Sequence, residues 1–293
     1  MSGFWQLSFE LGARDPDSTA ECCFELGATS VTYVDAYDDP VLEPLPGEFR
    51  LWPTTRLRAL FPDEADTQAI ARALADTLGI PADGLRTEHI EDRVWEREWL
   101  RDFHAMRFGQ RLWICPHHEQ VTEPGAIVVH MDPGLAFGTG THPTTALCLE
   151  WLDALDLNGK TITDYGCGSG ILAIAALKLG AASAIGVDND PQALTASIDN
   201  AERNDVADRL AVFLPEDIDA EPADVFIANI LAGPLGALAP TFAAAAKPGA
   251  PFAISGILDG QQEELLQRYA EWFDELRVDT REDWVRISGR RRA

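Results

Sequence analysis

The strongest chemical signal in the sequence is a glycine-rich loop at residues 164–170, which reads Asp-Tyr-Gly-Cys-Gly-Ser-Gly. It stands between an apolar, β-branched stretch at 161–165 and an apolar stretch at 171–179, so it is predicted to join a strand to a helix. Glycines at such a junction let the backbone turn tightly and let a ligand approach closely. The free N–H groups of the helix N-terminus suit a polar or anionic ligand group, so the loop predicts a cofactor site.

The spacing of the glycines selects among the cofactors that such loops bind. Dinucleotide-binding loops place glycines at relative positions one, three and six. Here the glycines at 166, 168 and 170 fall at one, three and five, and no Lys-Ser or Lys-Thr pair follows that would indicate a P-loop. With Asp164 two residues before the first glycine, the loop resembles the first motif of Rossmann-like methyltransferases that use S-adenosylmethionine. Gly166 and Gly168 are therefore predicted to line the cofactor.

Asp188 stands at the end of the next predicted strand, about 20 residues after Gly166, which is the usual distance of a ribose-binding acid from such a loop. A carboxylate at this place can accept hydrogen bonds from both ribose hydroxyls. The alternative role, capping the next helix, is better filled by Asp190, because Asp190 precedes a proline suited to the first helical turn. Asp188 is therefore predicted to bind the ribose.

Asn229 ends a further predicted strand, at the carboxyl edge where open α/β sheets bind their ligands. Residues 229–232 read Asn-Ile-Leu-Ala, whereas many amino-methyltransferases carry Asn-Pro-Pro-Tyr there and stack the aromatic ring on a planar nitrogen. The lack of proline and of an aromatic residue favours a flexible sp³ amine as the methyl acceptor. We hypothesise that Asn229 positions this amine through its side-chain oxygen or nearby carbonyls.

Residues 132–145 form an unusual Gly- and Thr-rich segment, Asp-Pro-Gly-Leu-Ala-Phe-Gly-Thr-Gly-Thr-His-Pro-Thr-Thr. It closely resembles the signature of the ribosomal protein L11 methyltransferase family. The glycine loop, Asp188 and the stretch from Asn229 follow in the order and spacing of that family, and the match is strongest over residues 128–235. The resemblance implies that the cofactor contacts fall on Thr145, Gly166, Asp188 and Asn229.

The resemblance also implies an activity: transfer of methyl groups from S-adenosylmethionine to the N-terminal α-amine and lysine side chains of ribosomal protein L11. It implies that the N-terminal domain grips the substrate and that a linker lets the catalytic domain be repositioned. His142, within the signature, is a candidate general base. A helix-capping or hydroxyl-bonding role is favoured for it, because the departing thioether is neutral and needs no acid.

The N-terminal residues 1–92 are predicted to be a small substrate-recognition domain. Strands are expected at 4–11, 30–37, 56–61 and 85–90, and helices at 18–26 and 66–78. The order βαββαβ is that of a ferredoxin-like α+β fold. Residues 93–107, charged and aromatic, are predicted to be a linker helix, although they could instead cap one domain.

Residues 108–293 are predicted to be a Rossmann-like, seven-stranded methyltransferase domain of the α/β class. Strands are expected at 161–165, 184–188, 210–214, 225–229 and 252–255, and helices at 171–179, 191–204, 235–246 and 261–273. Stretches 276–280 and 284–288 are expected to form an antiparallel hairpin on the sheet edge. The arginine run at 290–292 is expected to be a solvated tail.

The composition limits the partners and the compartment. Acidic residues outnumber basic ones by 48 to 23, a formal charge of −25, which argues against a nucleic-acid binder and against an anionic membrane surface. The same charge permits a basic protein partner, although it also fits a solubility surface or a saline habitat. Five cysteines without a Cys-x-x-Cys pair make a disulfide framework or a zinc site unexpected. No secretory signal or membrane segment is visible, so a cytoplasmic location is expected.

Three other functions stay open at this point. The nearest is a methyltransferase of the same fold that acts on another protein or on a small amine. A nicotinamide oxidoreductase is disfavoured by the glycine spacing. A binding module that senses the cofactor without turnover is the third.

Overall fold

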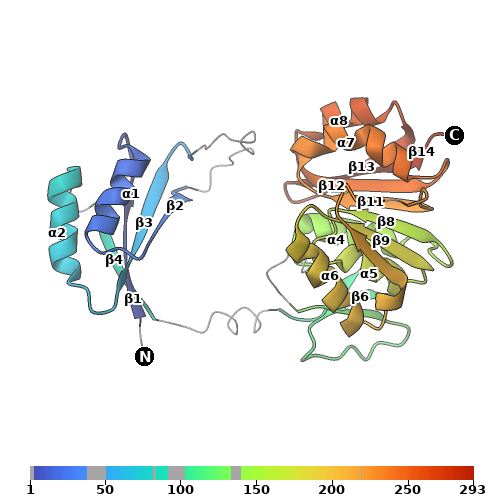
Figure 1. Ribbon diagram of the computed structural model, residues 1–293, viewed down its shortest axis with the longest axis horizontal. Helices are drawn as coiled ribbons and strands as arrows, with labels where there is room; N and C mark the ends of the chain where they lie inside the picture. The colour runs from blue at the N-terminus through green and yellow to red at the C-terminus, as the bar shows by residue number, and fades with distance from the viewer. Residues whose placement is uncertain (1–2, 38–50, 82–83, 92–102, 133–139, 219) are drawn as a thin grey trace. The chain divides into compact units, whose positions relative to one another are not determined.

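A computed structural model describes residues 3–37, 51–81, 84–91, 103–132, 140–218 and 220–293. The chain forms two compact units, Met1–Glu98 and Trp99–Ala293, each of which is described by itself (Figure 1). None of the helices in the described ranges could span a membrane.

The N-terminal unit has the predicted order βαββαβ. Its elements are β1 (Gly3–Glu10), α1 (Pro16–Glu25), β2 (Ser30–Asp35), β3 (Thr55–Pro62), α2 (Thr67–Leu78) and β4 (Arg86–Glu91). The strands form one antiparallel sheet in the order β2-β3-β1-β4, which confirms the ferredoxin-like fold. Alternate strand residues such as Leu7, Leu57 and Phe61 are fully buried and pack with Cys23 of α1 and Leu74 of α2.

The helix ends in this unit follow from local capping. Helix α1 begins at Pro16, because the side chain of Asp15 accepts a hydrogen bond from the Ser18 backbone N–H. The helix predicted at 18–26 therefore begins two residues earlier than expected. Asp66 caps α2 in the same way, and Gly79 ends it in a left-handed conformation.

The C-terminal unit is built on a seven-stranded sheet in the order β10-β9-β8-β11-β12-β14-β13, which confirms the Rossmann-like fold. Its strands are β8 (Thr161–Tyr165), β9 (Ser183–Val187), β10 (Leu210–Phe213), β11 (Val225–Asn229), β12 (Pro251–Leu258), β13 (Phe273–Arg281) and β14 (Trp284–Arg291). The first five run parallel, whereas β14 is antiparallel to both β12 and β13. The predicted hairpin thus forms, with β13 at the edge.

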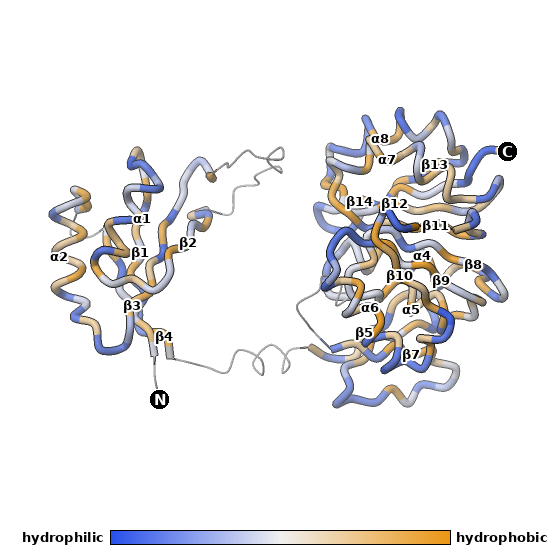
Figure 2. Tube along the Cα trace, in the orientation of Figure 1, coloured by the Kyte–Doolittle hydropathy of each residue, from blue (hydrophilic) through white to orange (hydrophobic). Residues whose placement is uncertain are grey.

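Helices cover both faces of this sheet (Figure 1). They are α4 (Pro143–Asp153), α5 (Ile171–Lys178), α6 (Pro191–Arg203), the 3₁₀ turn η1 (Ala207–Arg209), α7 (Ala232–Ala245) and α8 (Gln262–Tyr269). Within β11, Val225 and Ile227 pack with the α4 and α5 side, whereas Phe226 and Ala228 pack with α7 and α8. Apolar residues gather in these interior elements, and the connecting loops are hydrophilic (Figure 2).

A second, three-stranded sheet in this unit was not predicted. It contains β5 (Met106–Phe108), β6 (Leu112–Cys115) and β7 (Ile127–His130) in the order β5-β6-β7. Most of the predicted linker helix 93–107 lies outside the described residues. Its last two residues belong to β5, so the helix prediction was wrong there, because Met106 pairs across the sheet with Ile114.

The C-terminal arginines form part of the fold, so the prediction of a solvated tail at 290–292 was also wrong. Arg290 and Arg291 lie in β14. Their guanidinium groups donate to the Gly249 and Ala243 carbonyl oxygens at 3.0 and 2.9 Å. Arg292 donates to the Ala270 carbonyl at 3.1 Å. Backbone carbonyls that would otherwise lack partners explain why arginine is used at this strand end.

Candidate active site

Three of the predicted site residues meet at the carboxyl edge of the seven-stranded sheet. Strand β8 lies between β9 and β11, with Tyr165 opposite Val187 on one side and Ala228 on the other. The residues that continue these strands, Gly166 and Asp188, therefore lie beside Asn229, the last residue of β11. This is the edge at which ligands bind in open α/β sheets.

Gly166 begins the glycine loop and cannot carry a side chain there. Its φ is +78°, and a Cβ atom would collide with Cγ2 of Ile230. The N–H groups of Gly166 and Cys167 both donate to the Val187 carbonyl, at 2.6 and 3.0 Å. The loop is thus held close against the end of β9, and its glycines leave the backbone open to a ligand.

Asp188 organises the same loop through both carboxylate oxygens. Oδ2 accepts a hydrogen bond from the Gly168 N–H at 2.8 Å, and Oδ1 accepts one from the Asp190 N–H at 3.0 Å. Each oxygen keeps further acceptor capacity, so the carboxylate can still receive two hydroxyl groups. Asp190 caps α6 through the Gln192 N–H at 2.8 Å, which confirms the predicted helix-capping role of this aspartate.

Asn229 contacts Thr145 of α4, which the family resemblance had placed in the same site. Nδ2 of Asn229 donates to Oγ1 of Thr145 at 3.4 Å, and Thr145 is buried. Residues 133–139 of the Gly- and Thr-rich segment lie outside the described residues. Its end is the N-terminus of α4, where the His142 ring accepts from the Thr144 N–H. The capping role predicted for His142 is confirmed, and burial lowers the pKa of its imidazole.

Two residues of α6 that were not predicted support the glycine loop. Oγ of Ser197 donates to the Gly168 carbonyl at 2.9 Å, and Nδ2 of Asn200 donates to the Ser169 carbonyl at 2.9 Å. Both side chains are buried. A sequence signal existed, since these polar residues lie three positions apart and therefore on one helix face, together with the buried Ala193 and Ala201.

Asp164 is the most unusual group beneath the loop. It is 0% exposed, and Oδ2 accepts from the Ala173 N–H at 3.0 Å, whereas Oδ1 has no hydrogen-bond partner in the part of the chain that the structure describes. Burial raises the pKa of its carboxyl group to about 7. An orphaned acceptor under a ligand-binding loop is suited to a ligand that brings a hydrogen-bond donor.

This raised pKa gives a pH dependence to the stability of the free protein. The folded state holds the Asp164 proton up to about pH 7, whereas an unfolded chain releases it near pH 3.9. The free energy of unfolding should therefore fall as the pH rises from 4 to 7, by about 4 kcal/mol at most. In Asp164→Asn this loss should be absent. Urea unfolding without ligand at pH 5 and pH 8 measures it, and an equal pH response of the two proteins would refute the assignment.

The cysteines of the site are expected to be unreactive. Burial raises the pKa values of Cys148 and Cys167 to about 12, so the nucleophilic thiolate is scarce at pH 8. Cys22 of α1 is partly exposed, although burial and Glu25 raise the pKa of its thiol too. A thiol reagent should thus modify Cys22 first and leave ligand binding intact. Peptide mapping would contradict this if Cys167 were labelled in the folded protein.

The sequence matches a known protein family over nearly its whole length. The family described as Ribosomal protein L11 methyltransferase (PrmA) matches residues 3–292. A ribosomal protein L11 methyltransferase of Actinobacillus pleuropneumoniae is 56% identical over 286 residues, which are 97% of this chain and 98% of that protein. One of Vibrio campbellii is 56% identical over 272 residues, 91% of each chain.

A solved structure of the same family also matches this chain. The crystal structure of a ribosomal protein L11 methylase from Lactobacillus delbrueckii subsp. bulgaricus matches with a TM-score of 0.60 and 32% identity. The match covers 65% of this chain and all of that one. Taken with the family match over residues 3–292, these likenesses show that the chain belongs to the ribosomal protein L11 methyltransferase family.

Proposed function

We propose that this chain transfers methyl groups from S-adenosylmethionine to the N-terminal α-amine and lysine side chains of ribosomal protein L11, in the cytoplasm. The observation that carries the proposal is the meeting of the glycine loop, Asp188 and the Asn229–Thr145 pair at one sheet edge. Relatives that are 56% identical bear the name of this activity. The formal charge of −25 favours a basic protein partner, and we expect direct binding neither to nucleic acid nor to a membrane.

The described residues fit S-adenosylmethionine. The carboxylate of Asp188 suits the two ribose hydroxyls, and Gly166 leaves room for close approach. The orphaned Oδ1 of Asp164 suits a cationic or N–H-bearing part of the same molecule. We therefore assign cofactor binding to Thr145, Gly166, Gly168, Asp188 and Asn229, with no metal ion in the reaction.

Methyl transfer requires the protein mainly to position the amine and the methyl donor. S-adenosylmethionine supplies a methyl group on a positively charged sulfur, and an uncharged amine displaces the sulfur in line. Because Nδ2 of Asn229 is directed to Thr145, its Oδ1 is left to accept an N–H of the amine. This contact would hold the amine with its lone pair toward the methyl group, as a near-attack geometry requires. The neutral thioether leaves without a proton donor.

The proton that the amine must lose sets the pH dependence. An α-amine with a pKa of about 7.7–8.0 is partly uncharged near neutral pH, whereas a lysine at about 10.4 must be lowered by about three units, roughly 4–5 kcal/mol. Desolvation at the sheet edge, or loss of the proton to water before binding, can supply this difference. The ring nitrogen of His142 is used to cap α4, so we assign it no proton transfer.

We further propose that the three segments divide the work. Residues 1–92 would recognise the substrate, residues 93–107 would link the domains, and residues 108–293 would carry the reaction. The separation of the chain into two compact units near residue 98 supports this division.

The test is intact-mass analysis of purified ribosomal protein L11 after incubation with this protein and S-adenosylmethionine. Increments of whole methyl groups are expected, and fragment masses should place them on the N-terminal α-amine and on lysines. No increment, with cofactor binding demonstrated separately, would reject L11 as the substrate and would leave the fold assignment untouched.

A further inference from the structure

The sheet of the N-terminal unit has a charged face opposite its helices. On β1 the core residues Leu7 and Phe9 alternate with Ser8 and Glu10, which point to this other face. The neighbouring strands contribute arginines to it: Arg56 stands opposite Glu10, and both Arg58 and Arg86 stand opposite Ser8. Residues directly opposite one another share a face, so three arginines surround the end of β1.

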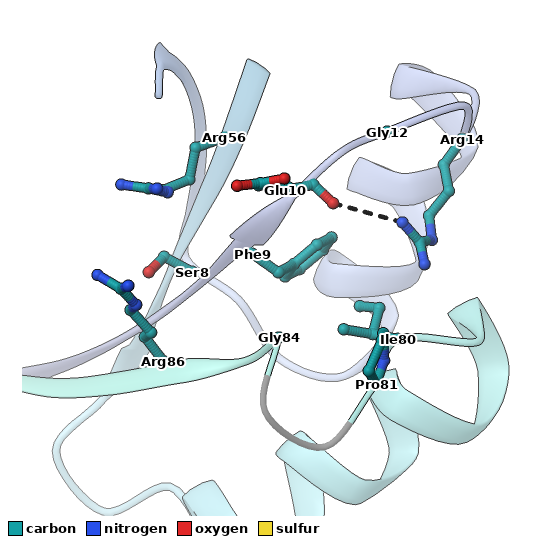
Figure 3. A pocket seen from close by; sticks show the side chains of 10 residues that line it. All are labelled: Ser8, Phe9, Glu10, Gly12, Arg14, Arg56, Ile80, Pro81, Gly84 and Arg86. Carbon is teal, nitrogen blue, oxygen red and sulfur yellow. Dashed lines mark hydrogen bonds between the residues drawn. The ribbon is translucent and has the colours of Figure 1, made fainter. Parts of the chain in front are cut away.

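A depression at this end of β1 is bordered by Arg56 and Arg86 (Figure 3). Ser8 and Glu10 lie between the two arginines, which come from the strands on either side of β1. The strands on either side of β1 are two inter-strand distances apart, which is about 10 Å. Two arginine side chains can close around one bound group across such a distance.

The arginines at the depression differ in what they already bind. Arg14 also lines it, but its guanidinium donates to backbone carbonyls of Leu78 at 2.8 Å and of Leu11 at 3.1 Å, and so fixes the end of α2 to β1. In contrast, Arg56 and Arg86 make no ion pair or side-chain hydrogen bond with any described part of the chain. Their forked donors remain available, and a carboxylate or a phosphate matches them.

The surroundings favour a carboxylate on a protein over a nucleic-acid backbone. Acidic residues far outnumber arginines in residues 1–98, and lysine is absent there, so a polyanion would be repelled as it approached. The Glu10 carboxylate lies in the same depression and would oppose a second phosphate. A protein surface that carries an acidic group beside a basic one suits this depression. Its acidic group can bind the two arginines, and its basic group can pair with Glu10.

We propose that this depression docks the protein substrate, with Arg56 and Arg86 holding a carboxylate and Glu10 pairing with a neighbouring cation. The inference rests on the proposed function, since it takes the occupant to be the ribosomal protein that is methylated. The site is a docking surface of the N-terminal unit and contains none of the residues assigned to the cofactor or to the reacting amine. It should therefore govern the affinity for the whole protein and leave the chemical step alone.

The test reverses the two charges in the full-length protein. Arg56→Glu/Arg86→Glu should weaken binding of fluorescently labelled L11 and raise its KM at least tenfold, with kcat and S-adenosylhomocysteine affinity unchanged. Arg72→Glu/Arg277→Glu makes the same change of net charge at arginines elsewhere and should have less than a threefold effect. If the charge reversal disturbs folding, Arg56→Gln/Arg86→Gln takes its place and should have an intermediate effect on L11 binding and on KM.

The outcomes separate this inference from the proposed function. Methylation of L11 with equal KM for the reversal and its control would overturn the docking site and leave the function standing. Arginine-dependent binding of L11 without methylation would overturn the function and leave the docking site. L11 that is neither bound nor methylated would reject both. If a single-stranded RNA oligonucleotide displaced labelled L11 from the protein, the ligand of the arginines would be a phosphate and not a protein carboxylate. That result would overturn the assignment.

Discussion

Replacing Asp188 by alanine should weaken S-adenosylmethionine binding about 100-fold. The carboxylate has two duties, because it is expected to receive two ribose hydroxyls and it already accepts the Gly168 N–H at 2.8 Å. Hydrogen bonds to a charged group contribute about 1.5–3 kcal/mol each. Even partial compensation by water leaves roughly 3 kcal/mol, which corresponds to about two powers of ten in Kd. Calorimetric titration with S-adenosylhomocysteine measures the change directly.

Asp190 supplies a matched control two residues away. Its carboxylate caps α6 through the Gln192 N–H, and it is exposed. Asp190→Ala should therefore lower the free energy of unfolding by about 1 kcal/mol and leave cofactor affinity within a factor of three. If the two variants weakened binding equally, the carboxylate of Asp188 would have no special role.

A cofactor analogue separates the two duties of Asp188. Against an S-adenosylhomocysteine analogue without ribose hydroxyls, Asp188→Ala should lose little affinity relative to the unchanged protein. The coupling between the substitution and the hydroxyls then measures the direct contact. A loss of equal size with both ligands would show that Asp188 acts only by holding the Gly168 N–H.

Much of the fold was accessible from sequence because its signals are local and repeated. The glycine loop predicted the junction of β8 and α5, and Pro191 behind Asp190 predicted the start of α6. Alternation of strands and helices then leaves few arrangements for a parallel sheet. The structure then shows that β8 lies between β9 and β11, which brings Gly166, Asp188 and Asn229 together at the carboxyl edge.

The parts that sequence reasoning missed depend on contacts between distant segments. Strands β5, β6 and β7 are three or four residues long, and only their mutual pairing makes them strands. The arginines at 290–292 look like a solvated tail until the carbonyls of Ala243 and Gly249 are brought beside them. Likewise, the packing of Ile230 against Gly166 joins the ends of two strands that are far apart in the chain.

The second large effect is expected at Asn229, where turnover should fall more than cofactor affinity. Nδ2 of Asn229 donates to Thr145 Oγ1, which fixes the amide so that Oδ1 can accept from the amine. Removing one preorganised group of this kind typically costs about 10²–10³ in rate. Asn229→Ala should therefore lower kcat for L11 methylation at least 100-fold, as measured by single-turnover mass analysis. Full turnover in this variant would remove Asn229 from the mechanism.

Substitutions at Thr145 test whether the orientation of the Asn229 amide explains the expected fall in kcat. Thr145→Val keeps the shape of this buried side chain but removes Oγ1, so the amide loses its anchor and kcat should fall by roughly tenfold. Thr145→Ser retains the hydroxyl and should restore most of the rate. Asn229 is also assigned to the cofactor, and S-adenosylhomocysteine titration separates the two roles. If Asn229→Ala weakened that binding by as much as it slowed turnover, Asn229 would hold the cofactor and the positioning of the amine would have to come from another group.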